Sequence, residues 1–328
     1  MYGHSPKIAA IFAVFTMLTF SSRSAQAADD IKPICPTRLM CLGDSITDGF
    51  WLSGGYRNTL CEELTTHGEE KLVDFVGPNW GGCGYDPQHA GYSGYSIENI
   101  AQEQSISGQR TGIASIIDNL LTQYPADVIF LQIGTNDILS LYDLDHFGKR
   151  LEPLVDTILD AIPAGGMLYL ATLPCMDAND TLYIDPAYFT PDSMDEAIEY
   201  CNAQIRAIAA QKQQQGKPIR LAEVNRVLEK SELYDGVHPN ETGYEKLGLF
   251  WYDVLQSYWR GEELSAPVLC GDINGDGTVS VADAVLLMRH LHTQSPLTVE
   301  QASVADLDGD RNLTAKDLVL LKRKMAQS

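Results

Sequence analysis

The chain has 328 residues, and 45% of them are hydrophobic, which is enough for a sizeable buried core. At roughly 150 residues per domain, this length predicts two domains. The 44 acidic residues outnumber the 23 Lys and Arg and give a net charge of −21, which argues against nucleic acid and against an anionic membrane surface as partners.

The first 27 residues have the pattern of a secretory signal peptide. Lys7 supplies a positive charge, residues 8–20 form an unbroken apolar run, and Ala25-Gln26-Ala27 has the small residues of a cleavage site. A run of about 13 apolar residues is too short to span a bilayer, and a membrane anchor is the alternative. We therefore expect a secreted, extracellular protein that is cleaved near Ala27.

Export would permit disulfide bonds among the seven cysteines. An odd number leaves at least one cysteine unpaired, and the sequence does not assign any pairing. No two cysteines have the C-x-x-C spacing, so we expect neither a thiol redox site nor a cysteine zinc site.

Short apolar runs alternate with helical patterns from residue 38 to residue 259. The runs predict strands at 38–42, 72–76, 128–133, 167–171 and 219–224. The other segments predict helices at 57–66, 112–123, 146–161, 194–213 and 241–257. This alternation predicts an α/β domain over residues 28–260, with a parallel sheet of about five strands and helices on both faces. In such sheets, ligands bind at the carboxyl ends of the strands.

Three polar blocks carry the candidate chemistry. Ser45 lies in Gly-Asp-Ser directly after the first strand, Asn136 lies in Gly-Thr-Asn-Asp directly after the third, and Asp235 and His238 precede the last helix. An Asp and a His three residues apart can hydrogen-bond to each other and leave the second imidazole nitrogen free for a serine. The pattern therefore predicts a serine nucleophile. The chain has no G-x-S-x-G motif, which argues against an α/β-hydrolase.

The three blocks, in this order, resemble the SGNH hydrolase superfamily, also called GDSL esterases. The resemblance implies an SGNH-type three-layer α/β/α sandwich and a serine esterase. In this sequence the implied nucleophile is Ser45, and His238 is the implied general base and then general acid. Asp235 would orient His238.

The resemblance also implies an oxyanion hole, because a tetrahedral intermediate needs convergent hydrogen-bond donors at its new oxyanion. The implied donors are the backbone amides of Ser45 and Gly94 and the side-chain amide of Asn136. Gly91 is an alternative to Gly94. No cluster of carboxylate and histidine residues suggests a metal in these blocks, and we expect no catalytic metal.

A further resemblance narrows the substrate. GGYR at 54–57, FVG at 75–77 and the segment 89–97 follow one another as in carbohydrate esterase family three, the acetylxylan esterases, whose members remove acetyl groups from xylan. Where that family often has His-Glu-Gly-His-x-Gly-Trp, this chain has HAGYSGY, and Tyr92 and Tyr95 keep an aromatic surface that suits sugar stacking or ordinary packing. The resemblance implies an acetylated polysaccharide substrate. The alternatives are a pectin, mannan or lipid acyl ester, or a non-catalytic carbohydrate-binding module.

Beyond a linker over 261–270, two segments about 34 residues apart repeat the oxygen-bearing side chains of a twelve-residue calcium loop. The expected ligands are Asp272, Asn274, Asp276, Thr278 and Asp283 in the first loop and Asp306, Asp308, Asp310, Asn312 and Asp317 in the second. Helices are predicted at 281–292 and 315–325. The repeat resembles a type I dockerin over 271–328. The resemblance implies a small all-α domain, two structural calcium ions, a cohesin partner and attachment to a cellulosome.

Two details of the loops lead to further predictions. Arg311 occupies loop position 6 of the second loop, where the calcium-loop pattern has a glycine. A side chain in a left-handed turn costs roughly 1–2 kcal/mol. We therefore expect the second loop to bind calcium more weakly than the first. In dockerins, loop positions 10 and 11 help to face the cohesin. Here these positions hold Val281, Ala282, Ala315 and Lys316, a largely apolar set.

Overall fold

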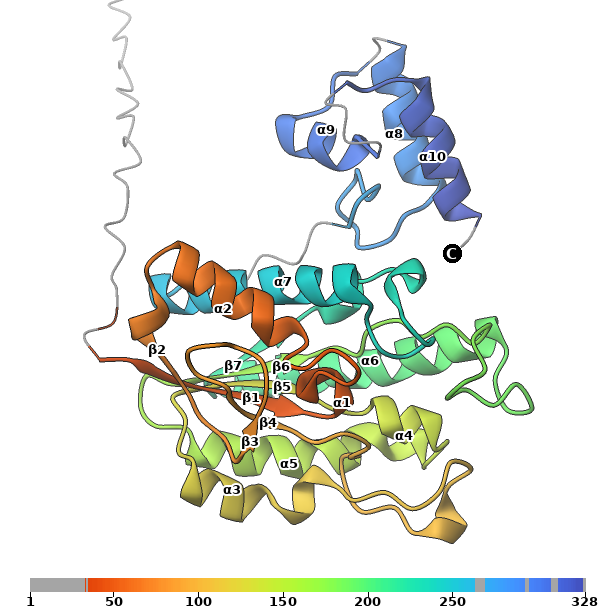
Figure 1. Cartoon of the computed structure of the whole chain (residues 1–328). Helices are drawn as coiled ribbons and strands as arrows, with labels where there is room; N and C mark the ends of the chain where they lie inside the picture. The colour runs from red at the N-terminus through yellow and green to blue at the C-terminus, as the bar shows by residue number, and fades with distance from the viewer. Residues whose placement is uncertain (1–32, 34, 263–268, 293–294, 308–311, 327–328) are drawn as a thin grey trace, which may run out of the picture. The chain divides into compact units, whose positions relative to one another are not determined.

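A computed structural model of the protein describes residues 33, 35–262, 269–292, 295–307 and 312–326 (Figure 1). The signal peptide predicted over 1–27, most of the predicted linker, and Asp308, Asp310 and Arg311 of the second loop lie outside the described residues. Of the helices that are described, none has both the length and the apolar character needed to cross a membrane.

Five parallel strands form the centre of the sheet, which confirms the predicted α/β class. In the order in which they pair, they are β2 (Val73–Phe75), β1 (Thr37–Gly43), β5 (Val128–Gln132), β6 (Met167–Ala171) and β7 (Ile219–Ala222). β1 and β5 pair in register from Leu39 opposite Val128 to Gly43 opposite Gln132. The first and second polar blocks therefore begin side by side at one edge of the sheet.

The sequence did not predict two short strands beside β1. β4 (Gln88–Gly91) pairs in parallel with the last two residues of β1, and β3 (Asn79–Trp80) pairs antiparallel with β4. β4 reads Gln-His-Ala-Gly and has no apolar run, so its extended form depends on pairing rather than on strand propensity. These strands extend the sheet sideways, next to the carboxyl end of β1.

Helices cover both faces of the sheet (Figure 1). α2 (Tyr56–Thr66) and α7 (Glu241–Arg260) pack on one face, and α3 (Ile117–Gln123), α5 (Phe147–Ala161) and α6 (Pro191–Gln214) pack on the other. Two short helices, α1 (Ser45–Asp48) and α4 (Thr135–Leu139), follow directly after β1 and β5. This is the three-layer α/β/α sandwich that the resemblance implies.

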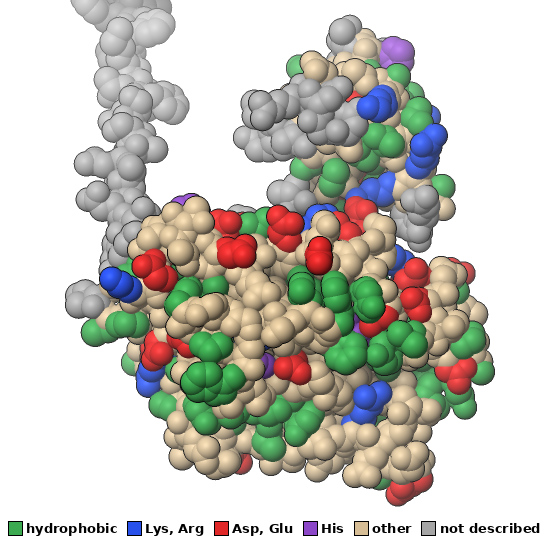
Figure 2. Space-filling model, viewed as in Figure 1, with side chains coloured by type: hydrophobic (Ala, Val, Ile, Leu, Met, Phe, Trp, Pro, Cys, Tyr) green, Lys and Arg blue, Asp and Glu red, His purple; other side chains and the backbone are tan. Residues whose placement is uncertain are grey.

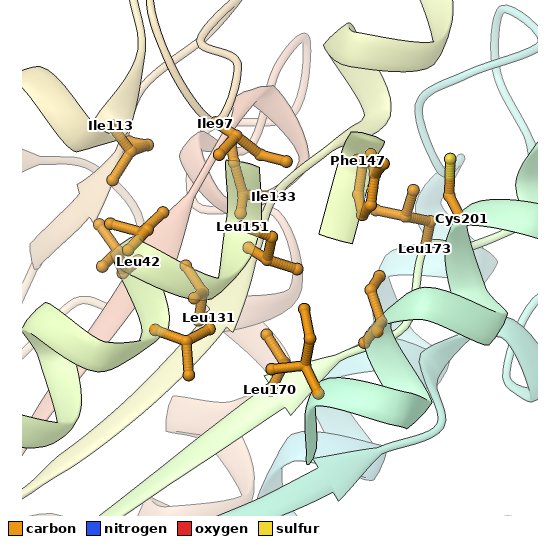
Figure 3. Packing of buried hydrophobic residues seen from close by; sticks show 14 of the residues in the cluster. Leu42, Ile97, Ile113, Leu131, Ile133, Phe147, Leu151, Leu170, Leu173 and Cys201 are labelled. Carbon is orange, nitrogen blue, oxygen red and sulfur yellow. The ribbon is translucent and has the colours of Figure 1, made fainter. Parts of the chain in front are cut away.

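Each face of the sheet has its own hydrophobic core, because successive side chains of a strand point to opposite faces. In β1, Met40 and Leu42 pack with α3, α5 and α6, whereas Leu39 and Cys41 pack with α2 and α7 around Trp251. Figure 3 shows the first of these cores. Burial of one such side chain contributes about 1.5–3 kcal/mol, so the two cores fix the positions of the strand ends.

One disulfide bond joins Cys61 of α2 to Cys83, which lies in the loop after β3. The remaining five cysteines are free thiols, namely Cys35, Cys41, Cys175, Cys201 and Cys270. The bond ties the β3–β4 loop to α2 and so restrains the segment next to the polar blocks.

The carboxy-terminal part contains α8 (Val281–Leu291), α9 (Val299–Ala305) and α10 (Ala315–Met325). α8 and α10 begin in the same way, because the hydroxyls of Ser280 and Thr314 cap them and each accepts a backbone N–H two residues on. The repeat in the sequence is therefore a structural repeat of loop, cap and helix, in a small all-α unit. Its core consists of Ile273, Ala284, Leu287, Ala305 and Leu321 with partly buried neighbours.

Candidate active site

Ser45 is held at the turn between β1 and α1. β1 ends at Gly43, where a side chain would collide with the carbonyl oxygen of Gln132. The carboxylate of Asp44 accepts the backbone N–H of Ile46 at 3.0 Å and caps α1. Ser45 is therefore the first residue of the helix, where backbone N–H groups have no acceptor inside the helix. Its side chain is nearly buried, at 7% exposure of the residue.

Two hydrogen bonds connect Ser45, His238 and Asp235. The Ser45 Oγ lies 2.9 Å from His238 Nε2, and His238 Nδ1 lies 2.8 Å from an Asp235 carboxylate oxygen. An ionised carboxylate can only accept, so Nδ1 carries the proton and Nε2 is left to accept the serine hydroxyl. The structure thus brings Ser45 of the first block together with Asp235 and His238 of the third, in an arrangement that can activate a serine.

Asp235 is fixed by its own loop. Its second carboxylate oxygen accepts the backbone N–H groups of Val237 at 3.1 Å and His238 at 2.8 Å. Burial raises the pKa of Asp235, but the hydrogen bonds from His238 outweigh burial and hold the pKa below its usual value. The carboxylate therefore stays ionised and keeps the imidazole in one tautomer.

Asn136 and Gly94 lie beside Ser45 on the wall of one pocket. The Asn136 side-chain amide donates one hydrogen bond to the carbonyl oxygen of Tyr95 at 2.8 Å, which leaves its second N–H for a ligand. Gly94 has a φ of +81°, a conformation that glycine adopts without strain. The alternative glycine, Gly91, lies on β4, and its backbone N–H already donates to His89 Nδ1 at 3.1 Å.

The pocket over Ser45 has a volume of about 270 Å³. Its lining residues are Ser45, Phe50, Ser93, Gly94, Arg110, Asn136, Leu139, Tyr183, Val237 and His238. The Phe50 ring covers the His238 imidazole with 4.4 Å between ring centroids, and Tyr183 meets it edge-on at 5.5 Å. The sequence did not predict Phe50, Tyr183 and Arg110 as residues of the site. For Phe50 the sequence offers one signal, namely an aromatic residue five positions after the candidate nucleophile, and the structure shows it 37% exposed at the pocket.

Buried charged groups hold the loops around the pocket. Asp137 pairs with Arg150 at 2.5 Å and accepts the backbone N–H of Ile97 at 3.1 Å, so it joins the second polar block to the segment after Gly94. Arg57 is buried and donates to the backbone carbonyl oxygens of Thr47 and Gly81, at 3.2 and 2.6 Å. These contacts tie α4 to the segment that follows Gly94, and α1 to the loop between β3 and β4.

The first candidate calcium loop is closed by its own carboxylates. Asp272 accepts the backbone N–H of Asp276 at 3.1 Å and of Gly277 at 2.7 Å, and Gly277 has a φ of +89° at the sharp turn. Asp283 is fully buried and accepts N–H groups from both ends of the loop, including Ile273 at 2.7 Å. Each oxygen has a second lone pair, so this all-oxygen donor set fits a hard cation such as calcium.

The second loop is described only in part. Asp317 is fully buried and accepts the backbone N–H of Leu307 at 3.0 Å and of Thr314 at 2.8 Å, as Asp283 does in the first loop. Asp306 and Asn312 are described, whereas Asp308, Asp310 and Arg311 are not. Among the described residues, no three His, Cys, Asp or Glu side chains lie together in an arrangement that could hold a metal ion.

The four candidate cohesin-facing residues all lie on the surface. Val281 and Ala282 form the first turn of α8, and Ala315 and Lys316 form the first turn of α10. All four are exposed, and Val281 is 67% exposed.

Comparison with known proteins gives a family match for each part of the chain. Residues 41–246 match the GDSL-like Lipase/Acylhydrolase family. The chain belongs to that family. The region that matches spans all three polar blocks of this GDSL-family protein, from the end of β1 to α7. Residues 270–326 match the Dockerin type I domain, so the GDSL-family domain is followed by a dockerin.

Two curated relatives resemble this GDSL-family chain. A "Multidomain esterase" from Ruminococcus flavefaciens is 32% identical over 96% of the chain, and the chain spans 42% of that protein's length. A "Putative endoglucanase X" from Acetivibrio thermocellus is 31% identical over 60% of the chain and 84% of that protein.

Solved structures show the same fold. A family 3 carbohydrate esterase from Clostridium thermocellum is 29% identical, with a TM-score of 0.53, and the match covers 69% of the chain and 98% of that structure. A carbohydrate esterase family 3 structure from Talaromyces cellulolyticus matches with a TM-score of 0.51 at 22% identity, over 70% of the chain and all of that structure.

Proposed function

We propose that this protein is a secreted serine esterase that removes O-acetyl groups from xylan or a related plant cell-wall polysaccharide. We further propose that its dockerin, ordered by two calcium ions, attaches it to a cohesin of a cellulosome. The observation that carries the enzymatic part is the hydrogen-bonded series Asp235–His238–Ser45, which opens onto a pocket with candidate oxyanion donors. The similarity to the C. thermocellum carbohydrate esterase supports the substrate class.

The geometry suits a two-step acyl transfer. His238 Nε2 takes the hydroxyl proton as Ser45 Oγ attacks the acetyl carbonyl carbon and forms a tetrahedral intermediate. When the intermediate collapses, the bond to the sugar oxygen breaks and His238 returns the proton to that oxygen. Water then attacks the acetyl-enzyme with His238 as base, which releases acetate and restores Ser45.

We propose that three donors stabilise the oxyanion of each tetrahedral intermediate. They are the Ser45 backbone N–H at the start of α1, the Gly94 backbone N–H and the second N–H of Asn136. Gly94 is preferred over Gly91, because the Gly91 N–H is already donated to His89. A single donor of this kind typically accounts for about 10²–10³-fold in rate.

The lining of the pocket suits a small acyl group next to Ser45. The pocket has a volume of about 270 Å³. Phe50, Leu139 and Val237 supply apolar surface for one methyl group.

The test compares wild type with Ser45→Ala on acetylated xylan, acetylated mannan, acetylated pectin and a long-chain ester. Ser53→Ala is the matched control, because Ser53 is exposed eight residues later and does not line the pocket. We expect Ser45→Ala to reduce acetate release at least about 10⁴-fold and the control to retain full activity. Unchanged release by Ser45→Ala would overturn the catalytic assignment, and preference for the long-chain ester would overturn the substrate.

A further inference from the structure

A second groove adjoins the pocket over Ser45. Its volume is about 490 Å³, and Ser93 lines both the groove and the pocket. We call it the Trp80 groove, after the residue at its edge, and it is also lined by Asp48, His89 and Tyr92. Asp48 lies one turn of α1 after Ser45, so the groove lies next to the pocket over Ser45.

Trp80 is exposed to an extent that folding does not explain. It is 72% exposed on β3, whereas Trp51 is 38% exposed and Trp251 is fully buried. The indole therefore contributes little to either hydrophobic core. Tyr92 and Tyr95, which also line the groove, pack against each other with 4.9 Å between ring centroids. In Figure 2, a histidine and an acidic side chain near the middle of this face of the GDSL-family domain are flanked by hydrophobic side chains.

The polar groups of the groove match the needs of a sugar hydroxyl, which both donates and accepts. His89 Nδ1 accepts the N–H of Gly91, so Nε2 carries the ring proton, and burial together with Arg57 lowers the pKa of His89 to about 3 and keeps the ring neutral. Asp48 accepts the Ser93 hydroxyl at 2.5 Å with one oxygen. Its other oxygen lies 4.0 Å from His89 Nε2, too far for a direct hydrogen bond and close enough for one hydroxyl to bridge.

The charge of the groove points to a neutral ligand. None of the described residues that line it is Lys or Arg, and Asp48 contributes a carboxylate to the lining. The whole chain carries a net charge of −21. Arg57 lies close by, but it is buried and its guanidinium donates to the backbone carbonyl oxygens of Asp48 and Gly81. A uronate would therefore meet the exposed carboxylate of Asp48, and like charges at short range disfavour binding.

We propose that the Trp80 groove binds a neutral pyranose residue of the polysaccharide backbone next to the acetylated residue. Trp80 stacks on the C–H face of the ring, and Asp48 and His89 share one of its hydroxyls. The inference rests on the proposed function, and it adds a binding subsite and a preference for neutral over uronate backbones.

The experiment measures kcat/KM of the full chain on p-nitrophenyl acetate and on an acetylated xylo-oligosaccharide. The variants are Trp80→Ala and Trp80→Phe, and Tyr200→Ala is the control, because Tyr200 is 49% exposed on α6 outside the groove. We expect Trp80→Ala to lower the ratio of oligosaccharide to small-ester kcat/KM about tenfold, through KM. Trp80→Phe should recover most of the loss, and Tyr200→Ala should keep the wild-type ratio.

A Trp80→Ala ratio equal to that of wild type would overturn the subsite, as would an equal loss on both substrates. A lower KM for acetylated polygalacturonate than for acetylated xylan would overturn the preference for a neutral backbone. The proposed function fails in a different way, namely when wild type cleaves p-nitrophenyl acetate through Ser45 but releases no acetate from any polysaccharide.

Discussion

The side-chain amide of Asn136 has two N–H groups, and they serve different parts of the site. One donates to the carbonyl oxygen of Tyr95 and holds the loop that carries Gly94. The other is available at the pocket wall next to Ser45. A neutral amide suits this position, because it donates a hydrogen bond without bringing a charge that would alter the ionisation of His238 and Asp235.

Replacement of Asn136 tests this assignment. We expect Asn136→Ala to lower kcat on p-nitrophenyl acetate about 10²–10³-fold, because one oxyanion donor is lost in the transition state. KM should change less than threefold, since the ground-state carbonyl is less charged than the oxyanion. Steady-state kinetics measure both values, and Asn119→Ala, on the exposed surface of α3, is the control. A fall in kcat of less than tenfold would remove Asn136 from the oxyanion hole.

At the scale of secondary structure, the shortest of the described α-helices carries the candidate nucleophile. α1 has four residues and is capped by Asp44, which is fully buried beside the pocket. Burial raises the pKa of Asp44 from 3.8 to about 6, more than its hydrogen bond from Ile46 lowers it. An acid whose pKa is raised in the folded state stabilises the fold below its unfolded pKa, and this contribution is lost as the pH rises through the folded value.

Asp44→Asn should remove this pH dependence while it keeps the cap, because asparagine is an equally good N-cap. Between pH 4 and pH 7, we expect the free energy of unfolding of wild type to fall by about 2–3 kcal/mol relative to that of the variant. Urea titrations followed by tryptophan fluorescence measure it, since all four tryptophans lie in the part of the chain predicted as the catalytic domain. A difference between variant and wild type that stays constant from pH 4 to pH 7 would contradict the raised pKa.

The elements differ in how much of them the sequence predicts. β5 and β6 are apolar runs buried on both faces, so their composition predicts them directly. β3 and β4 are short and polar, and their extended form comes from pairing that no local pattern encodes. Ser45 and Asn136 follow strand ends and could therefore be placed together from the sequence.

Other parts of the site depend on the folded chain. Phe50, Arg110 and Tyr183 lie outside the main helices and strands, and only the packing of distant segments brings them to the pocket. The choice between Gly91 and Gly94 depends on which backbone N–H is already used, and this is visible only once His89 and Gly91 are placed. The exposure of Trp80 could not be predicted from the sequence either, because it follows from an edge strand that the sequence did not predict.

At the scale of the whole molecule, part of the acidic composition belongs to the dockerin. Some of the carboxylates are candidate ligands in the loops of the dockerin, where Asp272 and Asp283 are buried. Among the described residues of the dockerin, the core has five buried hydrophobic residues with partly buried neighbours, a small core for holding a domain of this size by itself. The GDSL-family domain has two larger cores on either side of its sheet. Calcium should therefore matter to one part of the chain and not to the other.

Removal of calcium by a chelator should affect the dockerin and leave the GDSL-family domain active. We expect removal of calcium to reduce cohesin binding at least about 100-fold, because folding of the loops is coupled to the cation. Hydrolysis of p-nitrophenyl acetate should stay within twofold of its original rate. Val281→Arg should abolish cohesin binding while calcium binding persists, since Val281 is 67% exposed at the start of α8. Binding to a cohesin panel, with and without chelator, measures these effects, and capture that survives chelation would contradict calcium-ordered docking.

The two loops should also differ from each other. Gly277 has a φ of +89° at the sharp turn of the first loop, and the equivalent residue of the second loop is Arg311. Because a side chain is disfavoured by roughly 1–2 kcal/mol in that conformation, the second site should bind calcium about five- to thirtyfold more weakly than the first. Calorimetric titration of the full chain should resolve two affinities, and Arg311→Gly should bring them together. Equal affinities in wild type would show that the second loop turns without the left-handed residue that the first loop requires.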